Sequence, residues 1–290
     1  MTRRRGSGSS ERKSQRSIVY LKFRRNRPAV AGCVMLGATL VCAILADYVA
    51  PYDPLKADLG NNLAPPSSTH ILGTDEMGRD LLSRIIHGAR ISLQLGLISV
   101  GTALVIGILI GAPAGYYGGL ADHMLMGIVN IMMAFPTFLL AIMIVAILGP
   151  SLSNCMVAVG IALIPLYARL SRAMFLYLRE LDFVQAARMI GASDVRIVFR
   201  HILPNSLAPL IVQSTLNIAT AILSAASLGF LGLGAEPPIP EWGAMVSRGR
   251  LYLVTAPHIS LYPGLAIMIT ALSLNMIGDG LRDALDPRMT

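Results

Sequence analysis

The sequence predicts an all-α membrane protein that crosses the bilayer with six helices. Hydrophobic residues make up 54% of the 290-residue chain, and charged residues only 14%, against about 25% in soluble domains. Six stretches of about spanning length contain no charged residue apart from Asp47 at the end of the first. They cover residues 29–50, 91–115, 124–148, 152–168, 207–230 and 260–278.

The chain begins with a basic tail, residues 1–28, which contains ten Lys and Arg residues and one acid. The rest of the chain carries one more acid than bases, so the tail accounts for the whole net charge of +8. This distribution gives no sign of a basic folded surface for nucleic acid. We expect the tail to lie in the cytoplasm, to be disordered in its first part and to touch anionic membrane lipid.

Residues 29–50 follow as the first membrane span. A basic stretch before an apolar run is also typical of a signal peptide, but no small-residue cleavage site ends this run cleanly, which favours a retained helix. Lys and Arg collect on the cytoplasmic side of membranes. With the N-terminus inside, the inner segments hold 18 of these residues and the outer segments hold 6. Both termini are therefore predicted to be cytoplasmic, including a short C-terminal tail, residues 281–290.

Residues 51–90 are predicted to form an extracytoplasmic segment that ends in an amphipathic helix. Thr74 can cap this helix at its start. Its apolar face would include Leu81, and its polar face would include Arg79, Asp80 and Arg84. Such a helix is expected to lie on the outer surface of the membrane.

The remaining five spans are predicted to form a core, residues 91–280. In the second span, Gly107, Gly111 and Gly115 repeat at four-residue spacing, a pattern of close contact between helices. In the fifth span, polar residues share one helical face, namely Gln213, Asn217, Thr220, Ser224 and Ser227. This stripe has two interpretations, hydrogen bonding between helices or one wall of a polar path through the membrane.

The inner loop between the fourth and fifth spans contains residues 183–204 and is predicted to form two short helices. Gly191 can adopt the left-handed conformation that ends the first helix. Ser193 or Asp194 can cap the second helix, which is expected to end near Pro204. The second helix presents an apolar face and a basic face, so the pair is suited to fit into another protein in the cytoplasm.

The outer loop, residues 231–259, holds three prolines between positions 237 and 240 and the only tryptophan, Trp242. We predict a rigid cap near the entrance of the membrane path. The alternative is that Trp242 anchors the loop at the membrane boundary, where tryptophan is enriched.

The inner loop resembles the EAA loop of the membrane subunits of binding-protein-dependent ABC importers, in which Glu-Ala-Ala is followed by Gly and later by Leu-Pro. The matching residues are Ala186, Ala187, Gly191, Leu203 and Pro204, while Gln185 replaces the glutamate and His201 a usual isoleucine. Residues 72–84, 230–245 and 278–288 narrow the resemblance to the C-type permease subunit of dipeptide and oligopeptide importers.

The resemblance implies the type I ABC importer transmembrane fold in a bacterial inner membrane, and half of a path for dipeptides or short oligopeptides. The implied partners are a second, homologous permease subunit, two cytoplasmic ATPase subunits and an extracytoplasmic binding protein. The chain lacks a Gly-x-x-x-x-Gly-Lys-Ser/Thr loop, so ATP and Mg²⁺ are expected on the ATPases. This chain is expected to bind no cofactor or metal and to catalyse no reaction.

Three sets of residues are implied as sites. Coupling to the ATPase is expected from Gln185, Ala186, Ala187, Gly191, Asp194, Arg200, Leu203 and Pro204. The pathway candidates are Gln213, Asn217, Thr220 and Ser224. An extracytoplasmic gate or binding-protein contact is expected from Arg79, Asp80, Glu241 and Trp242.

Other functions stay open at this point. The same family includes importers of glutathione and of nickel chelates. An ion- or proton-coupled secondary transporter would be expected to show internal repeats or an ionisable residue within the membrane, and neither is evident. A membrane-embedded enzyme would need a nucleophile or a metal cluster at membrane depth, whereas the five histidines are scattered through the loops.

Overall fold

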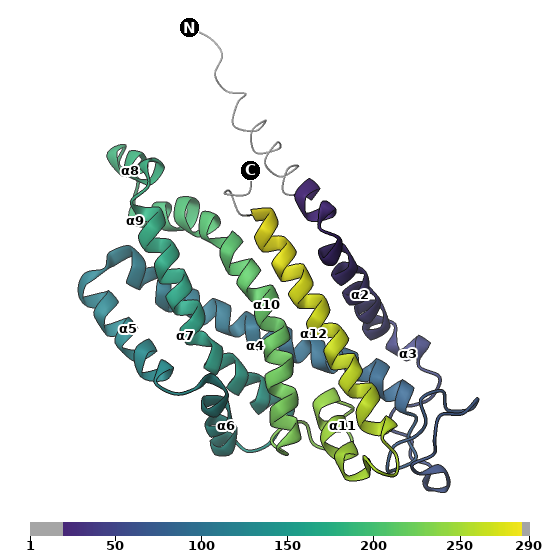
Figure 1. Cartoon of the computed structure of the whole chain (residues 1–290). Helices are drawn as coiled ribbons and strands as arrows, with labels where there is room; N and C mark the ends of the chain where they lie inside the picture. Colours follow the sequence, from purple (N-terminus) through teal and green to yellow (C-terminus); the bar gives the residue numbers. More distant parts are fainter. Residues whose placement is uncertain (1–19, 286–290) are drawn as a thin grey trace.

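The computed structural model describes residues 20–285, which fold into a bundle of long helices (Figure 1). The helices among these residues are α2 (Arg27–Ile44), α3 (Ala46–Val49), η1 (Leu59–Asn61), α4 (Leu81–Tyr117), α5 (Gly119–Met133), α6 (Thr137–Leu148), α7 (Leu152–Arg179), α8 (Asp182–Met189), α9 (Asp194–Ile197), η2 (Val198–Ile202), α10 (Leu203–Phe230), α11 (Trp242–Gly249), η3 (Arg250–Tyr252) and α12 (His258–Leu285). Most of the predicted tail 1–28, and the last five residues of the predicted tail 281–290, lie outside the described residues.

Within residues 20–285, five helical stretches are long and apolar enough to cross a membrane. They are α2, α4, α7, α12 and the stretch that runs from α9 through η2 into α10. The pair α5 and α6 is apolar enough to add a sixth span, but the two helices are bent by 87° at the break between them, a geometry of a broken span or of a re-entrant loop. This all-α arrangement agrees with the predicted fold class, but the third predicted span, residues 124–148, is broken rather than straight. Pro136 lies in the break, where it offers no N–H and disfavours a helical conformation at the preceding residue.

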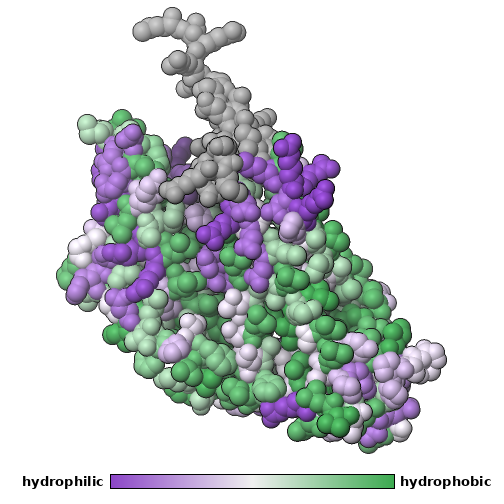
Figure 2. All heavy atoms as spheres, viewed as in Figure 1, coloured by the Kyte–Doolittle hydropathy of each residue, from purple (hydrophilic) through white to green (hydrophobic). Residues whose placement is uncertain are grey.

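The long helices lie side by side in the order α7, α10, α12 and α2, and α4 crosses behind them (Figure 1). The start of α2 meets the end of α12, where Asn26 Nδ2 donates to Asp283 Oδ2 at 3.3 Å. These two ends lie at the same end of the bundle as α8, which we call the inner end. The outer end carries α11 and the loop 50–80. Figure 2 shows hydrophilic residues gathered at the inner end and an apolar band along the helices, as expected of spans in lipid.

The glycine stripe of the second predicted span lies where α4 packs along α7. A Cβ atom built at Gly107 would lie 2.9 Å from the backbone nitrogen of Ala168, and one at Gly115 would lie 2.5 Å from the carbonyl oxygen of Arg172. At Gly111 it would lie 2.8 Å from the Cβ of Ser171. The prediction of close helix contact is therefore confirmed, because no larger side chain fits at these three positions.

The helix predicted to start after Thr74 begins instead at Leu81, and it is the first turn of α4 rather than a separate surface helix. Asp75 Oδ1 accepts hydrogen bonds from the backbone N–H groups of Met77 and Arg79, which folds this stretch into a turn. Gly78 has φ +73°, a left-handed conformation that a helix cannot include. The side chain of Asp80, not Thr74, caps α4.

Three other helix ends differ from the ends of the predicted segments. The first span, residues 29–50, ends at Ile44 and is followed by the short α3. The fourth span, residues 152–168, continues through Pro165 to Arg179. The second helix of the inner loop does not end near Pro204, because the π-helical turn η2 leads directly into α10, whose second residue is Pro204.

Candidate functional site

The inner loop 183–204 forms two helical pieces joined at Gly191, as the sequence predicts. Gly191 has φ +80°, which ends α8. The N–H of Ala192 donates to the carbonyl oxygen of Ala187, a bond that satisfies the last turn of α8. The second piece is α9 with the π-helical turn η2, and it continues directly into α10.

One face of this loop is anchored in the core of the bundle. Val184 and Ala187 of α8, and Ile197 and Ile202 of the second piece, are buried against the ends of α4 and α7. The opposite side ends in Met189 and Ile190, which are 88% and 86% exposed. Two large apolar side chains at the tip of a well-anchored loop form a surface suited to a protein partner.

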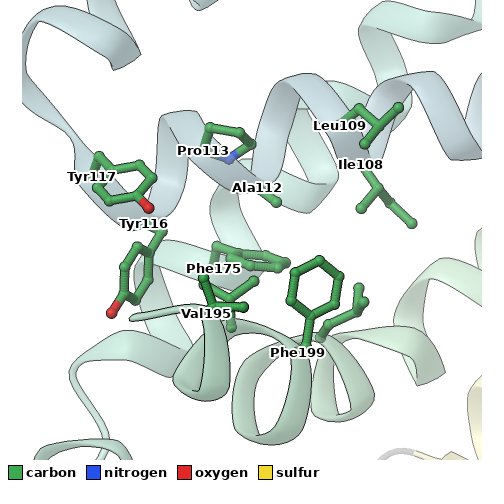
Figure 3. Close-up of a pocket in the computed structure, with 11 residues that line it drawn as sticks. Ile108, Leu109, Ala112, Pro113, Tyr116, Tyr117, Phe175, Val195 and Phe199 are labelled. Carbon is green, nitrogen blue, oxygen red and sulfur yellow. The ribbon is translucent and has the colours of Figure 1, made fainter. Parts of the chain in front are cut away.

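A cavity of about 210 Å³ separates the second piece of the loop from α4 (Figure 3). Its lining is mainly apolar, with Ile108 and Leu109 of α4, Phe175 of α7 and Phe199 of η2 among the residues around it. Beside it, the hydroxyl of Tyr116 donates to Asp194 Oδ1 at 2.6 Å. A short hydrogen bond therefore joins the loop to α4 beside a loosely packed region. The second piece of the loop can move into this cavity while the buried apolar face keeps its contacts.

The predicted coupling residues all lie in this loop or at the start of α10. Gln185 does not point to the tip, because its Nε2 donates to the carbonyl oxygen of Arg179 at 3.0 Å and so joins α8 to the end of α7. Ala186, Asp194, Arg200 and Pro204 are exposed, Leu203 is half-buried and Ala187 is buried. Sequence reasoning missed Tyr116, which no local motif connects to the loop, and gave no role to Met189 and Ile190.

The outer end contains a cluster of buried charges around Asp75. Asp75 Oδ2 lies 2.7 Å from Nε of Arg79 and 3.2 Å from Nε of Arg84. Arg84, only 1% exposed, also donates from Nη1 to the carbonyl oxygens of Pro54 at 2.8 Å and Pro238 at 3.4 Å. Arg84 therefore joins the loop 50–80 to the loop before α11.

Two further predicted residues hold α11 against α4. The carboxylate of Glu241 accepts hydrogen bonds from the N–H groups of Gly243 and Ala244 at 2.8 and 2.7 Å, and it caps α11. Trp242 is 1% exposed, and its Nε1 donates to the carbonyl oxygen of Ile85 at 3.0 Å. Burial raises the pKa of Glu241. The alternative that Trp242 anchors the loop in lipid is wrong, since its ring is enclosed by the chain itself.

Arg79, Asp80, Glu241 and Trp242 are thus brought together at one end of the bundle, but all four are buried. Asp80 caps α4 and lies 2.9 Å from Nδ1 of His70. These side chains shape and stiffen the outer end rather than form its exposed surface. A gate or a binding-protein contact at this end stays a prediction.

The polar stripe of α10 does not have one environment along its length. Asn217 is buried and accepts a hydrogen bond from Nε2 of Gln213 at 3.2 Å. Thr220 is exposed and Ser224 is half-buried. The stripe was interpreted either as hydrogen bonding between helices or as one wall of a polar path. The burial of Asn217 favours the first interpretation at that position, and the exposure of Thr220 favours the second.

No metal centre is evident in the part of the chain that the structure describes, since no three His, Cys, Asp or Glu side chains gather there closely enough to hold an ion.

Two protein families match this sequence. Residues 104–290 match the binding-protein-dependent transport system inner membrane component, and residues 14–66 match the N-terminal TM domain of oligopeptide transport permease C. The inner loop and the outer cap helix α11 both lie within the first of these regions.

Curated relatives cover nearly the whole chain. The dipeptide transport system permease protein DppC of Alkalihalophilus pseudofirmus is 48% identical over 93% of this chain and 89% of its own length. The di/tripeptide transport system permease protein DppC of Pseudomonas aeruginosa is 48% identical over 93% and 91%. The glutathione transport system permease protein GsiD of Pectobacterium atrosepticum is 47% identical over 93% and 90%.

The fold also matches a solved structure. A chain of the MetNI methionine ABC transporter, in an inward-facing conformation, superposes with a TM-score of 0.57 at 20% identity, covering 71% of this chain and 98% of that chain. This likeness supports the transmembrane fold of ABC importers.

Proposed function

This chain belongs to the inner membrane components of binding-protein-dependent transport systems, and from that membership we propose that it forms half of the membrane path of an ATP-driven importer of dipeptides or short oligopeptides. The observation that carries the proposal is its 48% identity to a dipeptide permease over 93% of the chain. A second, homologous permease subunit would supply the other half of the path. An extracytoplasmic binding protein would deliver the substrate, and two ATPase subunits would bind ATP and Mg²⁺.

The inner end is suited to receive force from an ATPase subunit. The exposed Met189 and Ile190 at the tip of α8 would fit an apolar groove on that subunit. The buried face of the same loop is anchored to α4 and α7, so a displacement of the tip would move the ends of these helices with it. Because Gln185 is bonded to the end of α7, we propose that apolar contact, and not a charge at this position, carries the coupling here.

The stretch from α9 to α10 would transmit this movement across the membrane. It contains 37 residues in continuous helical conformation, a length of about 55 Å at 1.5 Å per residue. At its outer end, the carbonyl oxygen of Phe230 accepts a hydrogen bond from Ser247 of α11 at 3.1 Å. Loop, helix and outer cap therefore form one connected path, through which two packings of the bundle could be interconverted.

The proposal of a peptide substrate rests mainly on the similarity to peptide permeases and less on any single side chain. Neutral polar residues of the stripe, Thr220 and Ser224, could solvate the backbone and termini of a peptide without holding it tightly. Glutathione is a second candidate, because a relative at 47% identity is named as a glutathione permease. The test is ATPase stimulation and uptake by the reconstituted transporter with its binding protein, using dipeptides, tripeptides and glutathione in parallel. Stimulation by glutathione alone would refute the peptide proposal.

Coupling through the loop is tested by Gly191→Val. Nothing lies within 4 Å of a Cβ built at Gly191, so the substitution acts through its left-handed backbone and would deform the turn between α8 and α9. We expect an assembled transporter that hydrolyses ATP without substrate uptake. Gly149→Val is the matched control, because Gly149 has φ +88° in equally open surroundings but lies between α6 and α7. Normal uptake by the Gly191 variant, or equal loss in both, would contradict the coupling assignment.

A further inference from the structure

A second recess lies between α5 and α7, away from the loop and the polar stripe. It has a volume of about 420 Å³ and is lined by Met126 and Asn130 of α5 and by Arg169 and Arg172 of α7. Two arginines among four lining residues are unusual in the membrane region of a protein, where ionisable side chains generally mark a function.

The two arginines differ in how their charge is compensated. Arg172 is paired with Asp122 through both carboxylate oxygens, at 2.5 Å from Nε and 2.6 Å from Nη2. Arg169 donates from Nη2 to the amide oxygen of Asn130 at 2.9 Å. Among residues 20–285 it has no carboxylate within ion-pair distance. The recess therefore keeps one uncompensated positive charge.

The position of Arg169 along α7 places this charge near the boundary of the membrane. Helix α7 begins at Leu152 at the outer end, and Arg169 follows 17 residues later, about 26 Å along the axis. The hydrocarbon core is about 30 Å thick, so Arg169 lies close to the headgroups of the inner leaflet. Exposed apolar side chains follow closely in the sequence of both helices, with Leu166 three residues before Arg169 on α7 and Ile131, 68% exposed, directly after Asn130 on α5.

From these observations we propose that the recess between α5 and α7 binds the phosphate of an anionic phospholipid of the inner leaflet. A guanidinium presents a planar pair of donors that matches phosphate oxygens, and Arg169 has donors left to offer. The acyl chains would lie along the apolar side chains beside the recess. Basic pockets between spanning helices on the cytoplasmic side are suited to such headgroups.

The recess fits a lipid phosphate better than the carboxylate of a transported peptide. A peptide also carries an ammonium group, which the uncompensated charge of Arg169 would repel. The carboxylate of Asp122, beside the recess, is already engaged by Arg172 through both of its oxygens. The proposal therefore does not depend on which substrate the transporter carries.

The test measures lipid selectivity of the complete transporter, reconstituted in phosphatidylcholine with spin-labelled phosphatidylglycerol or phosphatidylcholine as the probe. Arg169→Gln should lower the selectivity for phosphatidylglycerol about fivefold at one site, the effect of one basic residue near a membrane surface. Arg196→Gln is the control, because it removes one exposed positive charge of α9 at the inner end, outside both the recess and the basic tail. It should leave the selectivity of this site unchanged.

A second variant keeps the arginine and blocks the site. Asn130→Asp would place a carboxylate where the amide oxygen now lies 2.9 Å from Arg169, and it should lower the selectivity as much as Arg169→Gln. Unchanged selectivity in both variants would overturn the proposal. Equal losses in Arg169→Gln and Arg196→Gln would do the same, since they would indicate an effect of general surface charge. A raised KM for peptide with unchanged lipid selectivity would also overturn it and would assign the recess to the substrate.

Discussion

Replacing Gly111 with alanine tests whether the contact between α4 and α7 is what holds the bundle together. The added Cβ would lie 2.8 Å from the Cβ of Ser171 and 2.9 Å from the backbone nitrogen of Arg172, and real Cβ atoms essentially never come within 3.0 Å of such neighbours. The two helices would have to move apart by roughly half an ångström or more. Overpacking of this kind costs about 1–3 kcal/mol, while the gain in helix propensity from Gly to Ala is about 1 kcal/mol.

Gly101 provides a matched control on the same helix. Nothing lies within 4 Å of a Cβ built there, so Gly101→Ala should keep only the favourable propensity. The free energies of unfolding of the two variants should differ by about 1–3 kcal/mol, the overpacking cost alone. One kcal/mol shifts the unfolding midpoint of a domain of 150–250 residues by about 2–4 °C.

The assay is thermal unfolding of the detergent-solubilised transporter, followed by intrinsic fluorescence and by recovery in size-exclusion chromatography. We expect Gly111→Ala to unfold several degrees below Gly101→Ala. Equal midpoints for the two variants would refute the reasoning, because they would mean that the helices separate at no cost.

Three further variants test the outer cap, the stripe and the loop. Trp242→Ala should lower the free energy of unfolding by about 3–5 kcal/mol, as expected for a buried aromatic side chain. Trp242→Phe should lower it by about 1 kcal/mol, because only the hydrogen bond to Ile85 is lost. Equal midpoints of the two variants in thermal unfolding would contradict this. Thr220→Ala should reduce uptake with unchanged stability if the exposed part of the stripe lines the path, and unchanged uptake would assign it to packing. Gln185→Glu should weaken coupling of ATP hydrolysis to uptake, because a carboxylate cannot donate to the carbonyl oxygen of Arg179; improved coupling would show that the position contacts the ATPase directly.

The sequence predicted the parts of this fold that depend on local periodicity. Apolar stretches located the spans, the glycine spacing located the contact of α4 with α7, and Gly191 located the turn of the inner loop. It did not predict how residues distant in the chain come together. Arg84 was expected on the polar face of a surface helix, yet it is buried because Pro54 and Asp75 of the loop 50–80 and Pro238 of the loop before α11 surround it.

The same limit applies to the candidate site. A polar face on α10 could be recognised from spacing alone, but its division between a buried Asn217 and an exposed Thr220 depends on which neighbours pack against each turn. Likewise, Gln185 could be identified as a departure from the family pattern. Its bond to the end of α7 follows from the fold of the loop and not from the motif.

The buried charges of the outer end also constrain the order in which this protein can mature during synthesis. Ser92 contacts Glu241, and Trp242 contacts Ile85, across about 150 residues of sequence. These contacts cannot form until the ribosome has made α10 and the loop after it has crossed the membrane. Until then, Arg84 at the start of α4 lacks the carbonyl oxygen of Pro238 as an acceptor. Gly88, against which the ring of Trp242 packs in the folded protein, is also left uncovered. The packing of the outer end is therefore expected to be completed late, only after residue 242 has been made.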